Sequence, residues 1–367
     1  MSLFRERARG WAFALGLSIA CAPAAAPLRA QDSTAASATP AHSLPPMEIK
    51  AFVQVWYRTG DPLTKDGFKI RKADLKFQGD LSPLIHWRIS VDAAKTLSVS
   101  TTSERISDTA ALSSAAVDQK SRMLQEAAVT YTPNKRFSID VGQQLVPLTI
   151  EGWIPLSNLE TIERANFISE KSRAVGLGYV YDLGATANGT TPVGIEYHAG
   201  VFNEMGDDQN STDANDQKAL MGRLDYHIPL APGLQVGTSG GYEPGPFTQR
   251  KQRFGTDAQY KNDALTLRAE TMAGRDGALR RFGWYGLGAL RVTPDLQLVT
   301  RYDSWDRDRT GESTLNNAFE RQILLGGTYS IEGTTGKVAL NIIHQSFPNI
   351  SSVRDATFAL MAFQAAF

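Results

Sequence analysis

Basic side chains recur at alternate positions in this sequence, between positions filled by apolar residues. In LIHWRISVDA (84–93), Arg88 and Asp92 alternate with Trp87, Ile89 and Val91. Guanidinium and ammonium groups can replace the hydration shell of an anion, and rings of such groups set the selectivity of a pore. The pattern therefore indicates candidate anion contacts. The basic residues placed in this way are Lys72, Lys76, Arg88, Arg122, Arg136, Arg223, Arg268 and Arg301.

The same alternating positions carry carboxylates as well. These are Asp74, Asp92, Glu126, Asp140, Glu196, Asp225, Asp257, Glu270 and Asp303. If both sets of side chains line one channel, that channel is nearly neutral. It would pass small solutes with mild ion preference, because selectivity depends on the net local potential. Each arginine has two interpretations, a solvated or carboxylate-paired lumen residue or a direct contact for a passing anion, and the sequence leaves both open.

Other chemistry is poorly supported. GTSGG (237–241) matches the nucleophile pattern around Ser239, but that pattern needs a strand-to-helix turn, and here it falls within an amphipathic strand. The five histidines lack the spacing of a local metal pair. Acidic loops at 206–217 and 303–312 could hold divalent ions, although solvated loops are favoured. No nucleotide or nucleic-acid motif occurs, so we predict no enzyme, cofactor or metal.

The elements that must position these side chains are strands. Side chains of a strand point alternately to opposite faces, so period-two patterning gives one apolar and one charged face. Sixteen such segments are predicted, each about ten residues long, which is the length that a tilted strand needs to cross a bilayer. They begin near residues 47, 67, 84, 121, 135, 173, 192, 217, 233, 250, 263, 280, 295, 320, 336 and 355.

The connections between these segments alternate in length. Those at 94–120, 146–172, 204–216 and 306–319 are long, whereas 132–135, 229–233, 261–263 and 293–295 are short. Short turns at one end and long loops at the other are typical of a transmembrane antiparallel β-barrel. A soluble sandwich or propeller is the alternative, but it would not need this asymmetry.

The N-terminal region reads as an export signal. Arg5, Arg7 and Arg9 precede a short apolar run, and residues 1–30 are predicted to be a signal peptide. Acylation at Cys21, the only cysteine, is a weaker alternative. Cleavage would remove four basic residues and one acidic residue from totals of 38 each, leaving 34 and 37. Residues 31–46 form a predicted flexible leader, and 47–367 the barrel.

The apolar stretch FALMAFQAAF (358–367) is predicted to be the closing strand, paired with the first strand at about 47–58 so that no edge is free. Its apolar residues would face lipid, with Phe367 at an interface. An even strand number puts both ends of the barrel on the short-turn side, the periplasm.

Three stretches resemble the phosphate-selective porin O and P family: GFKIRKADLKFQGDL (67–81), EAAVTYTPNKRFSIDVGQQLVPL (126–148) and LETIERANF (159–167). RAVGLGYVYD (173–182) fits as the following strand. The resemblance implies a sixteen-stranded outer-membrane channel, typically a trimer, whose third long loop folds inward as a constriction. Here that loop is 146–172.

This third loop carries further candidates. Trp153 lies in an apolar run that suits a packed loop rather than a solvated one, and Glu163 belongs to the constriction. Arg164 matches the family's loop motif, while Lys171 and Arg173 lie at the loop exit.

The predicted function is a porin in the outer membrane of a Gram-negative cell that passes small hydrophilic solutes, with anions such as phosphate or polyphosphate implied by the resemblance. The expected partners are the lipid bilayer, small anionic solutes and two further copies of the chain. A general, weakly selective porin is the alternative. A plugged structural or adhesive barrel, or a hydrolase using Ser239 and His227, would lack a conducting pore.

Overall fold

The computed structural model describes the residues 46–61, 65–95, 123–169, 176–178, 180–206, 216–246, 250–311, 319–331, 335–348 and 354–367, and the backbone of 99–105 and 111–117. The predicted signal peptide and all but the last residue of the predicted leader lie outside these ranges.

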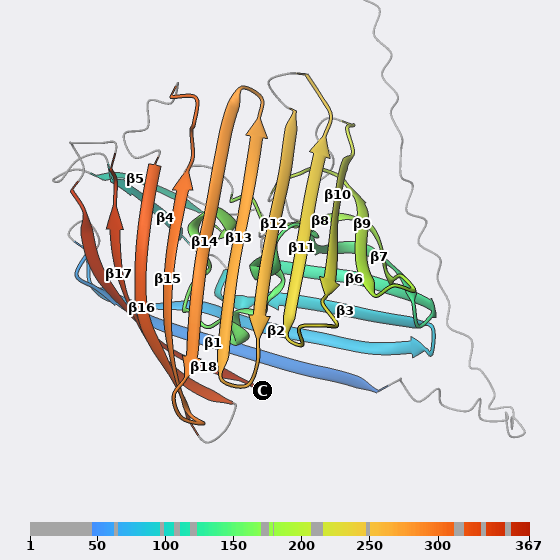
Figure 1. Ribbon diagram of the computed structural model, residues 1–367, viewed down its shortest axis with the longest axis horizontal. Coiled ribbons are helices and arrows are strands. Elements are labelled where there is room, and N and C mark those ends of the chain that lie inside the picture. Colours follow the sequence, from blue (N-terminus) through green and yellow to red (C-terminus); the bar gives the residue numbers. More distant parts are fainter. Residues whose placement is uncertain are drawn as a thin grey trace, which may run out of the picture. The chain divides into compact units, whose positions relative to one another are not determined.

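In the described residues sixteen strands form a closed antiparallel barrel, ordered β1-β18-β17-β16-β15-β14-β13-β12-β11-β10-β9-β8-β7-β6-β3-β2 (Figure 1). The barrel strands are β1 (Met47–Thr59), β2 (Gly67–Ser82), β3 (Ile85–Asp92), β6 (Leu124–Asn134), β7 (Phe137–Leu145), β8 (Tyr181–Thr190), β9 (Ile195–Phe202), β10 (Ala219–His227), β11 (Leu234–Glu243), β12 (Lys251–Lys261), β13 (Leu265–Asp276), β14 (Leu279–Arg291), β15 (Leu296–Asp306), β16 (Phe319–Ile331), β17 (Gly336–Ser346) and β18 (Ala356–Ala366). The predicted fold class, an all-β transmembrane antiparallel barrel of about sixteen strands, is confirmed.

The closing strand also lies where it was predicted. β18 pairs with β1 in the register Phe52↔Ala366 and Val55↔Phe363. Beyond the strand, Ala51 and Phe367 exchange two backbone hydrogen bonds of 2.6 and 2.9 Å. Every strand of the barrel therefore has two neighbours, and the backbone donors and acceptors at the seam are paired.

The period-two pattern separates an outer from an inner face. On β16, Ile323 and Leu325 are 47% and 59% exposed, whereas Leu324 between them is buried. The exposed positions of the strands include many large apolar residues, and the buried ones include many charged residues, which is the alternation expected when lipid lies outside and a polar interior inside.

Fifteen of the sixteen strands begin within three residues of the predicted starts. The exception is the segment predicted from residue 173, because β8 begins only at Tyr181. The amide of Leu177 donates to the carbonyl of Phe167 at 2.6 Å, so this part of the chain pairs with the loop before it enters the barrel wall. The third loop is correspondingly longer than predicted and runs to residue 180.

The long connection after β3 contains structure that the sequence pattern did not suggest. A short helical turn, η1 (Ala93–Lys95), is followed by β4 (Val99–Arg105) and β5 (Ala111–Val117), which form a separate two-stranded sheet. No helix in the described ranges is long and apolar enough to span a membrane.

The two ends of the barrel differ as predicted. The C-terminus lies at the same end as the short turn between β12 and β13 (Figure 1). The long third loop and the connection between β15 and β16 lie at the opposite end.

Candidate functional site

The candidate site is the third loop together with the inner barrel wall that it contacts. The loop leaves β7 and returns at β8, and its two ends are joined by a 3.0 Å hydrogen bond from the Val146 amide to the Val180 carbonyl. It contains three short helical segments, α1 (Ile150–Trp153), η2 (Leu156–Asn158) and α2 (Asn166–Ser169). Thr149 caps α1, since its hydroxyl accepts from the Gly152 amide at 3.1 Å.

The start of α1 contacts a carboxylate of the wall. Glu270 is an inward residue of β13, and its two oxygens accept from the backbone amides of Ile150 (2.9 Å) and Glu151 (3.4 Å). The first amides of a helix have no intrahelical partner, so a carboxylate at this place satisfies them and interacts favourably with the helix dipole.

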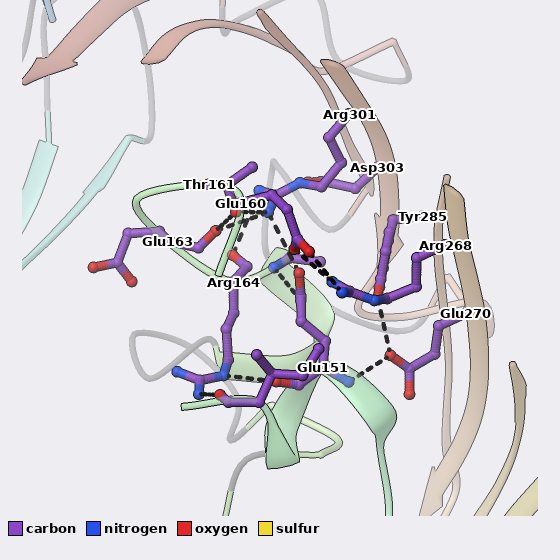
Figure 2. Close-up of polar contacts among 12 residues, drawn as sticks. Glu151, Glu160, Thr161, Glu163, Arg164, Arg268, Glu270, Tyr285, Arg301 and Asp303 are labelled. Atoms are coloured by element: carbon purple, nitrogen blue, oxygen red, sulfur yellow. Dashed lines mark hydrogen bonds and ion pairs between the residues drawn. The ribbon is translucent and has the colours of Figure 1, made fainter. Parts of the chain in front are cut away.

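Two arginines of the barrel wall bind residues 160–163 of the loop (Figure 2). Arg268 of β13 makes a bidentate ion pair with Glu160, at 3.0 and 3.1 Å. Arg301 of β15 donates to the Thr161 hydroxyl (3.2 Å) and to the Glu163 carbonyl (2.7 Å). Arg301 is also paired with Asp303 at 3.0 Å. The contacts of Arg268 and Arg301 with the loop join residues more than a hundred positions apart in the sequence.

A third arginine binds the loop from β2. Arg71 forms a bidentate pair with Glu163, with donor–acceptor distances of 2.5 and 3.0 Å. Its guanidinium also lies 5.6 Å from the centroid of the Trp56 ring. A β-bulge between Gln54 and Val55 shifts the register of β2 at this place, which turns Arg71 inward beside Lys72.

Apolar contacts complete the docking of the loop. Phe167 packs against Tyr285 and Trp305, with ring centroids 6.1 and 6.4 Å apart. Gly283 of β14 makes room for it, because a Cβ at this position would lie 2.3 Å from the Phe167 side chain. Leu156 and Leu159 pack on Phe52 of β1.

Arg164 was predicted to contact anions, but its side chain is buried and binds backbone groups of the loop. It is 6% exposed, and its guanidinium donates to the carbonyls of Glu151 (3.1 Å) and Ile154 (2.5 Å). It therefore links its own part of the loop to α1 and the residue that follows α1. Trp153 is half-buried, donates to the Val146 carbonyl at 2.8 Å and meets the ring of His198 edge-on at 4.4 Å.

The remaining predicted basic residues that the structure describes lie on β2, β3 and β10 and in the turn between β6 and β7. Lys76 pairs with Glu126 at 3.2 Å, and Arg88 lies 3.5 Å from Glu126 and 3.4 Å from Asp140. Lys72 pairs with Asp74 at 2.9 Å. Arg136 lines a polar hollow near the short turns, together with Asn188, Glu196 and His198.

Arg223 of β10 is the most completely neutralised of these arginines. It makes two hydrogen bonds with Asp225, at 2.6 and 2.8 Å, and two with Asp257, at 2.7 and 2.9 Å. Arg122, Lys171 and Arg173 were also predicted as candidates, and they lie outside the described residues.

The pair suggested for a hydrolase does not form. Ser239 is opposite Arg223 and His227 is opposite Gln235 in the β10–β11 ladder. Four ladder positions separate them along the strands, about 13 Å at the usual rise. Among the described residues there is also no group of three or more His, Cys, Asp or Glu side chains that could hold a metal ion.

Several contact residues were not among the predicted candidates. Arg71 was missed because the bulge breaks the alternation on which the prediction relied. Asn341, whose side-chain oxygen accepts from the Ile162 amide at 2.8 Å, has no charge to mark it. Glu320 holds Asn166 (2.6 Å) and Arg307 (2.6 Å), and its place at the start of a strand could have marked it.

A closed sixteen-stranded antiparallel barrel with a polar interior and a long loop held against its inner wall is the architecture of an outer-membrane porin. The chain belongs to the family described as phosphate-selective porin O and P, whose model matches residues 47–281, more than half of the chain. No curated protein sequence matches it.

Solved structures show the same fold at low identity. An anion-selective porin from Comamonas acidovorans is 11% identical, with 88% of this chain and 99% of that chain covered and a TM-score of 0.56. OmpF of Salmonella typhi, in complex with daunomycin, is 11% identical, with 88% and 97% covered and a TM-score of 0.58. The trimer form of in-vitro folded OmpT of Vibrio cholerae is 8% identical, with 88% and 99% covered and a TM-score of 0.56.

Proposed function

We propose that this porin is a weakly selective channel for the passive diffusion of small hydrophilic solutes. The observation that carries this proposal is the pairing of the inner-wall arginines with carboxylates. Arg223, Arg268 and Arg301 each bind at least one carboxylate within 3.1 Å, and all three side chains are almost fully buried. A paired and buried guanidinium has few N–H donors left for a passing anion. These arginines therefore belong to the structure of the wall and do not form a path for anions.

The third loop is proposed as the constriction. Most of the contacts described above fasten it to one part of the wall, from β13 through β18 to β1 and β2, while Trp153 contacts His198 of β9. Partly exposed charges of both signs then remain beside the lumen. Glu163 on the loop has a side chain that is 22% exposed, and Lys76 on β2 has one that is 34% exposed. Charges of both signs along one channel leave it with little net preference for either ion.

Anion passage, with phosphate or polyphosphate as the solute, is the second candidate. The observation in its favour is a group of basic side chains near the short-turn end of the wall. Lys337 donates to the Ser157 carbonyl at 2.9 Å and interacts electrostatically with Lys261 and Arg291. Within the described ranges, neither Lys261 nor Arg291 forms an ion pair with a carboxylate.

The proposed setting follows from the family and the fold. Residues 1–30 would direct export as a cleaved signal peptide, the barrel would reside in the outer membrane of a Gram-negative cell, and three copies would assemble, as in the trimer form of the Vibrio cholerae protein. The outward apolar residues supply the contact with lipid, and the function requires no catalysis, cofactor or metal.

Single-channel recording of the purified protein in planar bilayers tests the proposal. We expect open channels, a small reversal potential under a KCl gradient and no block of chloride current by added phosphate. Strong anion selectivity with phosphate block would establish the second candidate instead, and the block should then weaken in K261Q/R291Q. Absence of conductance would contradict both candidates and favour a plugged barrel.

A further inference from the structure

A polar hollow on the barrel wall extends from the short turn between β6 and β7 to the third loop. Its volume is about 210 Å³, which is smaller than the usual site of a drug-sized ligand, so it suits a solute of about amino-acid size. One end is the turn, and at the other end the ring of His198 meets Trp153 of α1 at 4.4 Å. The charged and polar side chains that line the hollow include Lys135, Arg136, Asn188, Thr190, Glu196 and His198.

Strand register places the charges of the hollow on the inner face. Thr190 lies directly opposite Glu196 in the β8–β9 ladder, and its amide donates to the Arg136 carbonyl at 3.1 Å. Arg136, Thr190 and Glu196 therefore form one row across three neighbouring strands. On the next strand Glu196 lies opposite Asp225, which is buried against Arg223 in the interior. The row consequently faces the lumen.

The two charged ends of this row are not paired with each other. Their backbones are two strand spacings apart, about 10 Å. Lys135 and Arg136 are exposed, and the Glu196 side chain is 44% exposed. Within the described ranges, no carboxylate pairs with Lys135 or Arg136, and the basic side chain at ion-pair distance from Glu196 is His227, at 3.7 Å. The hollow thus has a positive end and a negative end with room for a solute between them.

The floor of the hollow is fixed by its own contacts. The side-chain oxygen of Asn188 lies 2.8 Å from Nδ1 of His198, and its Nδ2 donates to Asp140 at 3.3 Å. Asp140 in turn lies 3.4 Å from Arg88. The imidazole is also held by its edge-on contact with Trp153. A floor that is ordered in advance lowers the entropic cost of binding a solute.

We propose that this hollow is a binding subsite for small polar zwitterions such as free α-amino acids. The solute carboxylate binds Lys135 and Arg136, and its ammonium group binds Glu196. Hydrogen bonds between ionised groups are the strong ones, and the two ends together select for a solute that carries both charges. An anion such as phosphate would meet the repulsion of Glu196, and a simple cation that of the two basic side chains.

The chemistry of the subsite also suits a channel. The proposal rests on the proposed function, because a solute reaches the inner wall by diffusing through the lumen. Passage requires binding that is strong enough to favour entry and weak enough to allow release. The exposure of Lys135, Arg136 and Glu196 keeps each contact hydrated, so we expect a dissociation constant of about 1 mM.

The test is a ligand-observed NMR titration of the purified full chain with L-serine, N-acetyl-L-serine and L-serinamide. Acetylation removes the positive charge of serine, and amidation removes its negative charge. We expect saturable binding of L-serine and affinities about ten-fold lower or less for the two analogues. Absence of L-serine binding, or equal affinities for the three probes, would overturn the proposal.

Two variants assign the ends of the hollow. E196Q should lower the affinity for L-serine to that of the unmodified chain for N-acetyl-L-serine, and K135Q/R136Q should lower it to that for L-serinamide. D263N is the matched control, because it removes an exposed acidic residue from another short turn, between β12 and β13. Unchanged L-serine affinity in both E196Q and K135Q/R136Q would place binding elsewhere and refute the subsite. An unchanged affinity of E196Q for N-acetyl-L-serine establishes that the hollow itself is intact.

Channel recording separates this proposal from the proposed function. L-serine should reduce the KCl current over the same concentration range in which it binds, and E196Q should remove this effect. A chain that binds L-serine but conducts no current would contradict the proposed function and leave the subsite supported. A conducting chain that does not bind L-serine would have the opposite meaning.

Discussion

Two acidic residues of the third loop, three positions apart, have opposite environments. Glu160 is buried and closed off by Arg268, whereas the Glu163 carboxylate is partly exposed beside Arg71. The charges of a buried ion pair largely cancel and lie out of reach of passing ions, so such a pair contributes mainly to the docking of the loop, whereas a partly exposed carboxylate can interact with ions in the lumen. We therefore expect Glu163 to influence ion selectivity and Glu160 to stabilise the docked loop.

We predict that E163Q shifts the channel toward anions, because it removes a negative charge beside the lumen and keeps the positive charge of Arg71. A change of roughly two-fold in the chloride-to-potassium permeability ratio is expected, measured as the reversal potential under a KCl gradient. E160Q is the matched control, since it should leave this ratio nearly unchanged. Its own effect should be weaker docking of the loop, seen as noisier current and a lower melting temperature. Identical reversal potentials in E163Q and the unmodified chain would contradict this assignment.

At the scale of elements, the loop depends on the absence of a side chain in the wall. Phe167 occupies the space over Gly283, where a methyl group would lie 2.3 Å from it. Gly286, three residues further along β14, has no atom within 4 Å of the corresponding position. Gly283 and Gly286 of the same strand thus differ in whether a neighbouring element requires the absence of a side chain.

We predict that G283A destabilises the docked loop by about 1–3 kcal/mol, because the overlap cannot be relieved without moving Phe167 or the strand. G286A should change stability by less than about 0.5 kcal/mol. Limited proteolysis of the loop and the variance of the open-channel current measure the effect. A smaller effect of G283A in an F167G background than in the unmodified chain would attribute the effect to the contact itself, because glycine lacks the Cβ that the added methyl group would meet. Equal behaviour of G283A and G286A would argue against it.

The strands could be predicted from the sequence because alternation is a local property, and each strand repeats it over about ten residues. The docking of the loop could not, because it joins distant residues: Glu160 and Arg268 are 108 positions apart. The sequence therefore identified Arg268 and Arg301 as inward, but it left open whether carboxylates neutralise them. The segment after residue 173 was predicted to be a strand because its apolar residues fit either the barrel wall or a loop packed against the inside of that wall. No local pattern distinguishes these two places.

At the scale of the whole molecule, the barrel depends on a seam between strands from opposite ends of the described chain. Val55 of β1 and Phe363 of β18 are directly opposite at this seam, and Ala359 lies opposite Thr59. Opposed residues in an antiparallel ladder have Cα atoms about 4.5–5.5 Å apart, within the range that a disulfide spans. Cys21, the only native cysteine, lies in the predicted signal peptide and would be absent from the exported chain.

We predict that V55C/F363C forms a disulfide in the folded barrel on mild oxidation, whereas V55C/A359C, displaced by four ladder positions, does not. Oxidation should raise the temperature at which the barrel unfolds, because strands can no longer separate at this seam and the crosslink closes a very long loop. Mobility on a non-reducing gel, with and without prior heating, measures both effects. Efficient crosslinking of the displaced pair, or of neither pair, would mean that β1 and β18 meet in a different register or do not close the barrel.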